Sequence, residues 1–174
     1  MSQPTSKPRD RSHIDVFREY PETSKAIGAL HEVIMRRESA FTPGERELMA
    51  AFVSALNGCN FCTGVHGAAA QAFGIETSLL EAIVADIGTA NVPEPMKPVL
   101  QFVARLTREP SRTGPADTDA MRAAGWDDKA IFDVVCVCSF YNFMNRYVDG
   151  TGLSAPPEQL RLMGQQLARA SNAH

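Results

Sequence analysis

Apolar residues recur three or four positions apart along most of the chain, which is the spacing of one face of an α-helix. Ile27, Leu30 and Ile34 follow this spacing near the start, and Ile131 and Val134 follow it near the end. Alternation with a period of two, which is typical of strands, is scarce. The pattern therefore predicts an all-α fold of seven or eight helices.

Capping residues, prolines and glycines mark where these helices begin and end. Thr42 and Glu45 form a capping-box sequence around Pro43, and Gly58 permits the left-handed conformation that closes a helix. Cys59 follows directly as the candidate cap of the next helix. The predicted helices cover residues 22–36, 43–57, 59–73, 78–86, 98–108, a short segment that ends at 125, a long segment from 127 or 128 to 150, and a last segment that opens at 156–157.

Length and composition fit one folded domain. The chain has 174 residues, of which 44% are hydrophobic and 21% are charged, and these values are close to average globular usage. Residues 1–13 are polar, so we expect a flexible arm there and a single domain over residues 14–174. The arm lacks the apolar core of a secretory signal, which predicts a cytoplasmic protein. No apolar stretch is long enough to predict a membrane span.

Charge argues against several classes of partner. The chain has 17 Lys and Arg against 20 Asp and Glu, which gives a formal net charge of -3. It has no basic block that would bind nucleic acid or an anionic membrane surface. We therefore expect small molecules or proteins as partners, and neither nucleic acid nor membrane.

Cys59 and Cys62 form a C-x-x-C pair at the start of a predicted helix. The thiolate is the reactive form of cysteine, and a free thiol with a pKa near ~8.5 is mostly protonated at neutral pH. The helix N-terminus favours negative charge on both sulfurs, and His66 lies one turn after Cys62, where its ring can accept the thiol proton. We therefore predict Cys62 as the attacking thiolate and Cys59 as the resolving thiol. Oxidation of Cys62 to a sulfenic acid would be followed by disulfide formation and release of water.

Glu47 is the candidate third member of this group. It lies on the preceding predicted helix, and the chain turns back at Gly58, so that a carboxylate at Glu47 can orient the His66 ring. By pattern alone, a solvated glutamate on the helix surface is the simpler interpretation.

Other chemistry-bearing residues allow less specific interpretations. Zinc is the main alternative to redox chemistry, but Cys59, Cys62 and His66 supply three ligands where a structural site needs four, so we predict no metal. We predict small buried side chains at Cys136 and Cys138. We predict that three histidines lie on the surface or are partly buried, namely His13, His31 and His174. We also predict that four polar residues tie down a helix end rather than face a pocket, namely Asn142, Asn145, Arg146 and Asp149.

The run from Glu45 to His66, which contains Glu47, Cys59 and Cys62, strongly resembles the core of the alkylhydroperoxidase D-like family within the carboxymuconolactone decarboxylase superfamily. Segments 123–126 and 141–153 look like its peroxidase-related branch, so the resemblance covers most of residues 20–155. It implies an all-helical fold, assembly into trimers or hexamers, and thiol-dependent reduction of hydroperoxides.

Positions that match the family motif take these roles by resemblance. Cys62 matches the peroxidatic cysteine, Cys59 its disulfide partner, His66 the relay base and Glu47 the relay carboxylate. Phe61 stands where the best-known member has a histidine, which removes one candidate proton donor. The predicted function is an antioxidant thiol peroxidase that uses a hydroperoxide and a thiol or dithiol reductant and needs no organic cofactor. The alternatives are a non-catalytic redox or stress sensor, a general disulfide oxidoreductase and, less favoured, a zinc-binding module.

Overall fold

The computed structural model describes residues 12–171, and within them every element is a helix, which confirms the predicted all-α fold. No helix in this range is both long enough and apolar enough to cross a membrane. In chain order the elements are α1 (His13–Glu19), α2 (Pro21–Arg36), α3 (Pro43–Asn57), α4 (Asn60–Ala72), α5 (Leu79–Ala85), α6 (Met96–Arg108), the 3-10 turn η1 (Pro110–Arg112), α7 (Pro115–Ala123), α8 (Asp128–Thr151) and α9 (Pro157–Ser171).

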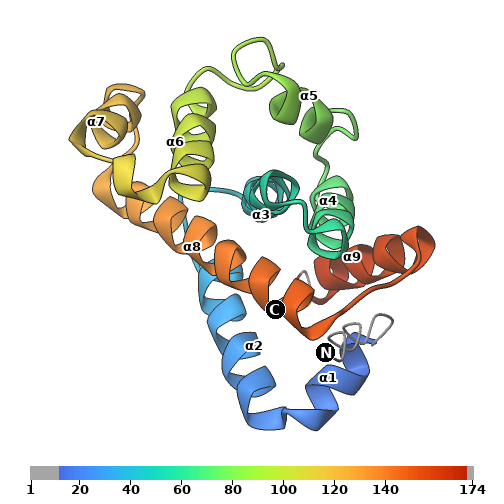
Figure 1. Ribbon diagram of the computed structural model, residues 1–174. Coiled ribbons are helices and arrows are strands. Elements are labelled where there is room, and N and C mark those ends of the chain that lie inside the picture. The colour runs from blue at the N-terminus through green and yellow to red at the C-terminus, as the bar shows by residue number, and fades with distance from the viewer. Residues whose placement is uncertain (1–11, 172–174) are drawn as a thin grey trace, which may run out of the picture.

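Helix α3 lies at the centre and contacts α2, α4, α5, α6 and α8 (Figure 1). Its N-terminus has the predicted capping box, in which the Thr42 hydroxyl accepts from the Glu45 N–H and the Glu45 carboxylate accepts from the Thr42 N–H at 2.8 Å. Its C-terminus is closed by Gly58 at φ 72°. Because neighbours cover α3 on several sides, residues 46–54 are all buried. A polar side chain in this stretch must therefore find its partners inside the protein.

The turn between α3 and α4 is very short. The N–H of Cys59 donates to the carbonyl of Ser54 at 3.0 Å, and α4 begins at the next residue. Cys59 occupies the N-cap position as predicted, but its side chain makes no capping hydrogen bond. The two helices consequently pack against each other.

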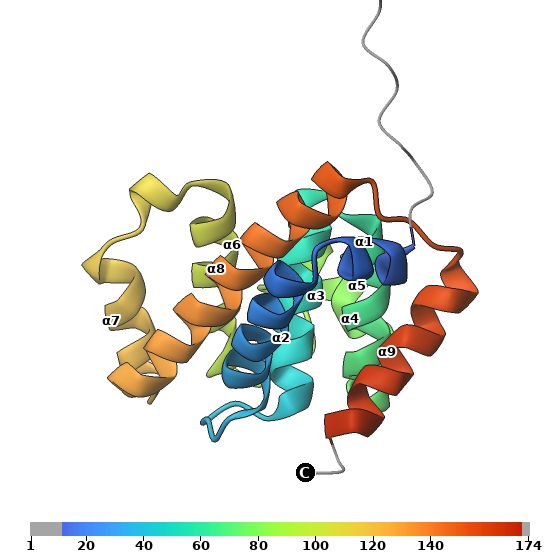
Figure 2. The same cartoon turned by 90° about the horizontal axis from the view of Figure 1, so that it is seen from below.

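Helix α9 packs closely on α4 (Figures 1 and 2). The contact depends on Gly164, because a Cβ at this position would lie 2.3 Å from the carbonyl oxygen of Val65. A side chain there would force the helices apart. This close approach keeps the C-terminal helix against the element that carries the cysteine pair.

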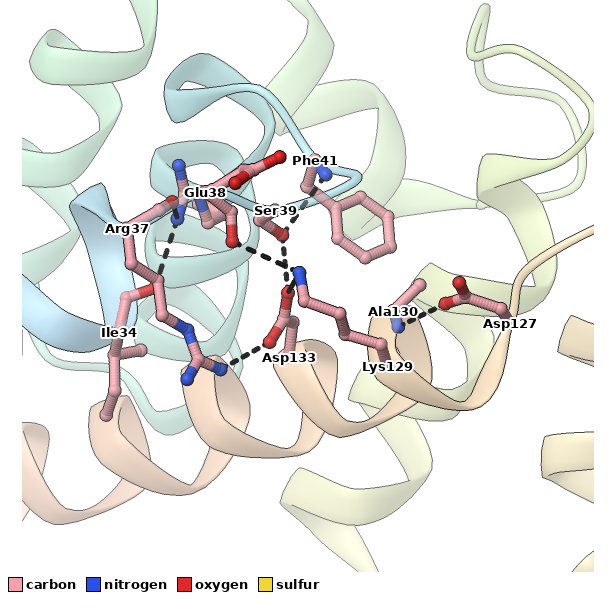
Figure 3. A network of polar contacts seen from close by, with 10 residues as sticks. Ile34, Arg37, Glu38, Ser39, Phe41, Asp127, Lys129, Ala130 and Asp133 are labelled. Atoms are coloured by element: carbon pink, nitrogen blue, oxygen red, sulfur yellow. Dashed lines mark hydrogen bonds and ion pairs between the residues drawn. The ribbon is translucent and has the colours of Figure 1, made fainter.

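A polar network joins the loop after α2 to the first turns of α8 (Figure 3). Asp133 of α8 is buried and accepts from the Arg37 guanidinium and, at 2.6 Å, from the Ser39 hydroxyl. Lys129 donates to the carbonyl of Glu38 at 3.2 Å. These bonds fix the C-terminal end of α2 against α8.

Helix α1 is not predicted by the apolar pattern. Ser12 caps it by accepting from the N–H of Asp15 at 3.2 Å, and Val16 is fully buried. Most of the expected N-terminal arm, residues 1–11, and His174 lie outside the described residues. The division into an arm and a single domain therefore stays a prediction.

Two predicted helix starts differ from the structure. Helix α6 begins at Met96, two residues before the predicted start at Pro98. The proline is tolerated there because N–H groups of the first turn have no partner within the helix. At α5, the Ser78 hydroxyl donates to the Glu76 carboxylate at 2.7 Å and does not cap the helix.

Candidate active site

The cysteine pair lies at the N-terminal end of α4, with both thiols free and both side chains buried. Val16 of α1 packs with Cys59 and Cys62 in one apolar cluster, together with Val148 and Leu153. The helix that the sequence pattern misses therefore helps to cover the predicted reactive centre.

The two sulfurs have different tendencies to ionise. A hydrogen bond from the Cys59 thiol is the main reason that the pKa of Cys62 lies below its ordinary value. Burial of Cys62 opposes this shift, whereas the charge of His66 and a hydrogen bond from Asn145 add to it. The same bond to Cys62, followed by burial, raises the pKa of Cys59. Cys62 is therefore the sulfur that loses its proton first.

The His66 ring is held in one orientation by Glu47. His66 Nδ1 lies 2.6 Å from Glu47 Oε2, and Arg36 donates to Glu47 Oε1 at 2.5 Å. Because a carboxylate only accepts hydrogen bonds, Nδ1 carries a proton and Nε2 is left as the basic nitrogen.

Glu47 itself is fully buried, so the interpretation as a solvated surface glutamate is wrong. Burial opposes its ionisation, but the charges and hydrogen bonds of His66 and Arg36 outweigh burial and hold the pKa of Glu47 below its usual value. Glu47 is consequently a carboxylate at neutral pH, balanced by two cationic or potentially cationic partners.

Two further members of this cluster escape the sequence pattern. The Tyr141 hydroxyl lies 3.4 Å from His66 Nδ1, and the two rings meet edge to face with centroids 4.5 Å apart. Burial, with Glu47 and Cys62 nearby, raises the pKa of Tyr141 well above its usual value, so it stays protonated. Arg36 is the other member. No local signal distinguishes it from Arg37, because its role depends on how α2 packs against α3.

A cavity of about 260 Å³ lies against Cys62 and His66. Its walls are mostly apolar and come from most of the surrounding helices. They include Phe17 of α1, Ile27 of α2, Phe61 of α4, Phe140 of α8 and Leu167 of α9. Of the two cysteines, only Cys62 lines it. The predicted nucleophile and the predicted base thus line the same cavity.

His31 of α2 also lines this cavity, which the sequence does not reveal. It is half-buried, as predicted. Burial, followed by the charge of His66, lowers the pKa of His31 to about 4. At neutral pH its ring is therefore uncharged.

The polar residues of α8 mainly join helices, as predicted. Asn145 is buried, accepts from Asn57 at 2.8 Å and donates to the Ser54 hydroxyl at 2.9 Å. Asn142 also accepts from Asn57, and exposed Arg146 donates to the carbonyl of Asn142. The effect of Asn145 on the pKa of Cys62 adds a role in the site that we did not predict.

The other two cysteines belong to a different part of the molecule. Cys138 is fully buried, with its sulfur 3.4 Å from the Thr107 hydroxyl, which confirms a buried structural side chain. Cys136 is only half-buried. Across residues 12–171, no group of three or more His, Cys, Asp or Glu side chains is arranged to hold a metal ion.

The segment of the chain that carries these residues matches a known family model. Residues 21–92 match the sequence model of the carboxymuconolactone decarboxylase family, and this segment contains Glu47, Cys59, Cys62 and His66. No curated protein matches the chain significantly in sequence.

Solved structures extend the likeness over most of the chain. An uncharacterised peroxidase-related protein from Silicibacter sp. TM1040 matches with 29% identity and a TM-score of 0.77, over 83% of this chain and 76% of that one. The alkylhydroperoxidase AhpD core of a peroxidase-related protein from Ralstonia eutropha JMP134 matches with 24% identity and a TM-score of 0.78, over 86% and 78%. The debrominase Bmp8, solved with 2,3,4-tribromopyrrole, matches with 15% identity and a TM-score of 0.71, over 83% and 77%. Taken together, the comparisons show that the chain has an alkylhydroperoxidase D-like fold and that its residues 21–92 match the carboxymuconolactone decarboxylase family model.

Proposed function

We propose that the protein is a thiol peroxidase in which Cys62 reduces a hydroperoxide, Cys59 resolves the product, and His66 with Glu47 moves the proton. One observation carries the proposal. Cys62, whose pKa is lowered, and His66, whose Nδ1 is bound to Glu47, line the same cavity. A nucleophile, a base and an orienting carboxylate beside an enclosed space form the arrangement that nucleophilic catalysis requires.

The reaction follows from this arrangement. His66 Nε2 accepts the proton of the Cys62 thiol, and buried Glu47 stabilises the imidazolium that forms. The Cys62 thiolate attacks the terminal peroxide oxygen, so that an S–O bond forms and the O–O bond breaks. The departing alkoxide takes the proton from His66 and leaves as an alcohol. Cys59 then attacks the sulfenic sulfur of Cys62, which forms a disulfide and releases water, and a dithiol reductant restores both thiols.

The walls of the cavity favour a particular kind of substrate and restrict the reductant. Apolar walls favour an organic hydroperoxide whose hydrocarbon part is removed from water on binding. Cys59 is covered by Val16, so a reductant that attacks the disulfide must enter through the cavity or displace α1. We therefore propose a small thiol or dithiol as the simplest electron donor.

The fold does not exclude the alternative functions, so experiments must test them. A non-catalytic redox sensor would use the same cysteine pair, but it would need neither the cavity nor the His66–Glu47 pair. A debrominase shares this fold at 15% identity, so the fold alone does not decide which bond is broken. Cytoplasmic location and assembly into trimers or hexamers likewise stay predictions, and light scattering would measure the assembly.

The test is intact-mass measurement of the reduced protein after one equivalent of cumene hydroperoxide. Wild type should lose two hydrogens as the disulfide forms, and Cys59→Ser should gain one oxygen on Cys62. Cys138→Ser, which removes another buried thiol, should behave as wild type. If Cys62→Ser is oxidised on Cys59 as fast as wild type is oxidised, the proposed order is wrong.

A second measurement separates the enzyme from the sensor. Excess cumene hydroperoxide is mixed with catalytic amounts of protein and dithiothreitol, and its consumption is followed. A catalyst should turn over many equivalents. Consumption no faster than with dithiothreitol alone, for every donor tried, would contradict the peroxidase proposal and favour the sensor.

A further inference from the structure

Tyr147 of α8 has a polar atom without a partner beside the cysteine pair. Its hydroxyl is buried and makes no hydrogen bond within the described part of the chain. Its ring lines the cavity and packs against the apolar cluster that contains Cys59 and Cys62. A buried hydroxyl without a hydrogen bond is energetically unfavourable unless a bound molecule supplies the missing partner.

Three hydroxyl groups belong to residues that line the cavity, and two of them lie within hydrogen-bond distance of a partner. The Tyr141 hydroxyl and Glu47 both lie at His66 Nδ1, and the Ser24 hydroxyl donates to the carbonyl of Tyr20 at 2.8 Å. The third belongs to Tyr147. Within residues 12–171 it is the hydroxyl of this cavity that has no hydrogen-bond partner, so it can donate to a bound molecule.

We propose that Tyr147 binds the hydroperoxide at Cys62 by donating a hydrogen bond to the oxygen that departs when the O–O bond breaks. This inference rests on the proposed peroxidase function. As the Cys62 sulfur bonds to the terminal oxygen, the O–O electron pair moves to the departing oxygen, which takes its proton from His66. Tyr147 keeps its own proton and stabilises the negative charge while it develops. Phe61, which lines the same cavity, has no group that can donate this bond.

The test removes only the hydroxyl. Tyr147→Phe keeps the ring that packs on the cluster, and Tyr20→Phe makes the same change at an exposed residue at the start of α2. Two rates are measured at one pH, namely oxidation of Cys62 by cumene hydroperoxide or hydrogen peroxide, and alkylation of Cys62 by iodoacetamide. Both reactions use the same thiolate, but only oxidation has a departing oxygen.

We expect Tyr147→Phe to slow oxidation on the order of 10- to 100-fold and to leave alkylation within about two-fold of wild type. Tyr20→Phe should match wild type in both reactions. Equal slowing of oxidation and alkylation would show that Tyr147 acts on the thiolate or on packing, and would overturn the inference. Unchanged oxidation would overturn it as well.

These outcomes are distinct from failure of the proposed function. If wild type reacts with neither hydroperoxide faster than free cysteine does, the peroxidase proposal fails and this inference fails with it. If wild type reacts rapidly and Tyr147→Phe reacts equally rapidly, only the role of Tyr147 is wrong.

Discussion

Two buried carboxylates, Glu47 and Asp133, are each held by one of two adjacent arginines at the end of α2. Arg36 donates to Glu47, and Arg37 donates to Asp133. The second hydrogen-bond partner of each carboxylate is a different type of side chain. Glu47 bonds to the ring of His66, whereas Asp133 bonds to the hydroxyl of Ser39.

This difference decides what each cluster can do. The hydrogen-bond partners of Asp133 are a guanidinium and a hydroxyl that only hold it in place, so its network ties α8 to the loop after α2. An imidazole can accept and donate a proton, and His66 lines a cavity with a thiol, so the Glu47 cluster can pass a proton to a reacting group. A buried ion pair thus indicates function only when a titratable partner connects it to a cavity.

The largest expected effect on the rate of Cys62 oxidation comes from replacing His66. His66→Asn should lower the rate of Cys62 oxidation by cumene hydroperoxide about 10²- to 10⁴-fold, because the thiol loses its base. Stopped-flow measurement of disulfide formation gives the rate, and circular dichroism checks that the variant is folded. A folded variant that reacts as fast as wild type would show that no relay is needed.

A change in the Asp133 cluster should lower the stability of the protein rather than the rate of Cys62 oxidation. Asp133→Asn should lower the free energy of unfolding by about 2 kcal/mol, because two hydrogen bonds lose their charged acceptor. Urea unfolding measures this change. The oxidation rate of the folded variant should stay near that of wild type, and a loss as large as that of His66→Asn would mean that the two clusters act as one.

The adjacent arginines allow a matched comparison. Arg36→Lys should slow Cys62 oxidation about 10-fold, because an ammonium group does not reproduce the guanidinium geometry that holds Glu47. Arg37→Lys makes the same change one residue later and should leave the rate near that of wild type. Equal effects on the rate would contradict the division between the two clusters.

The smallest expected effect is on the pH dependence of stability, and it comes from His31, which is not paired with Glu47 as His66 is. Because burial lowers the pKa of His31 from 6.5 to about 4, the unfolded chain binds its proton more tightly than the folded protein does. This group should make the folded protein most stable above pH 6.5 and less stable as the pH falls toward 4. Urea unfolding at several pH values should show a shallower loss in His31→Gln than in wild type. An identical pH dependence would mean that His31 is not held neutral by the fold.

Prediction from sequence worked best where the deciding interactions are local. The ends of α3 follow from Thr42, Glu45 and Gly58, whose effects act within one turn of the backbone. Helix α1 was missed because it has only seven residues and offers little periodic pattern. Its stability depends on burying Val16 against residues of α4 and α8, and these contacts lie far away in the sequence.

The sequence by itself determined the helices from α2 onward and the spacing of Cys59, Cys62 and His66, because helix geometry alone places residues three and four apart on one face. Only the tertiary structure decided that Glu47 is buried between His66 and Arg36 and that helices distant in sequence line a cavity at Cys62. It also decided that the Tyr147 hydroxyl has no partner among residues 12–171. The physical reason is that burial and the availability of a hydrogen-bond partner depend on which segments pack together. The spacing of apolar residues shows which face of a helix is buried, but not which helix covers it.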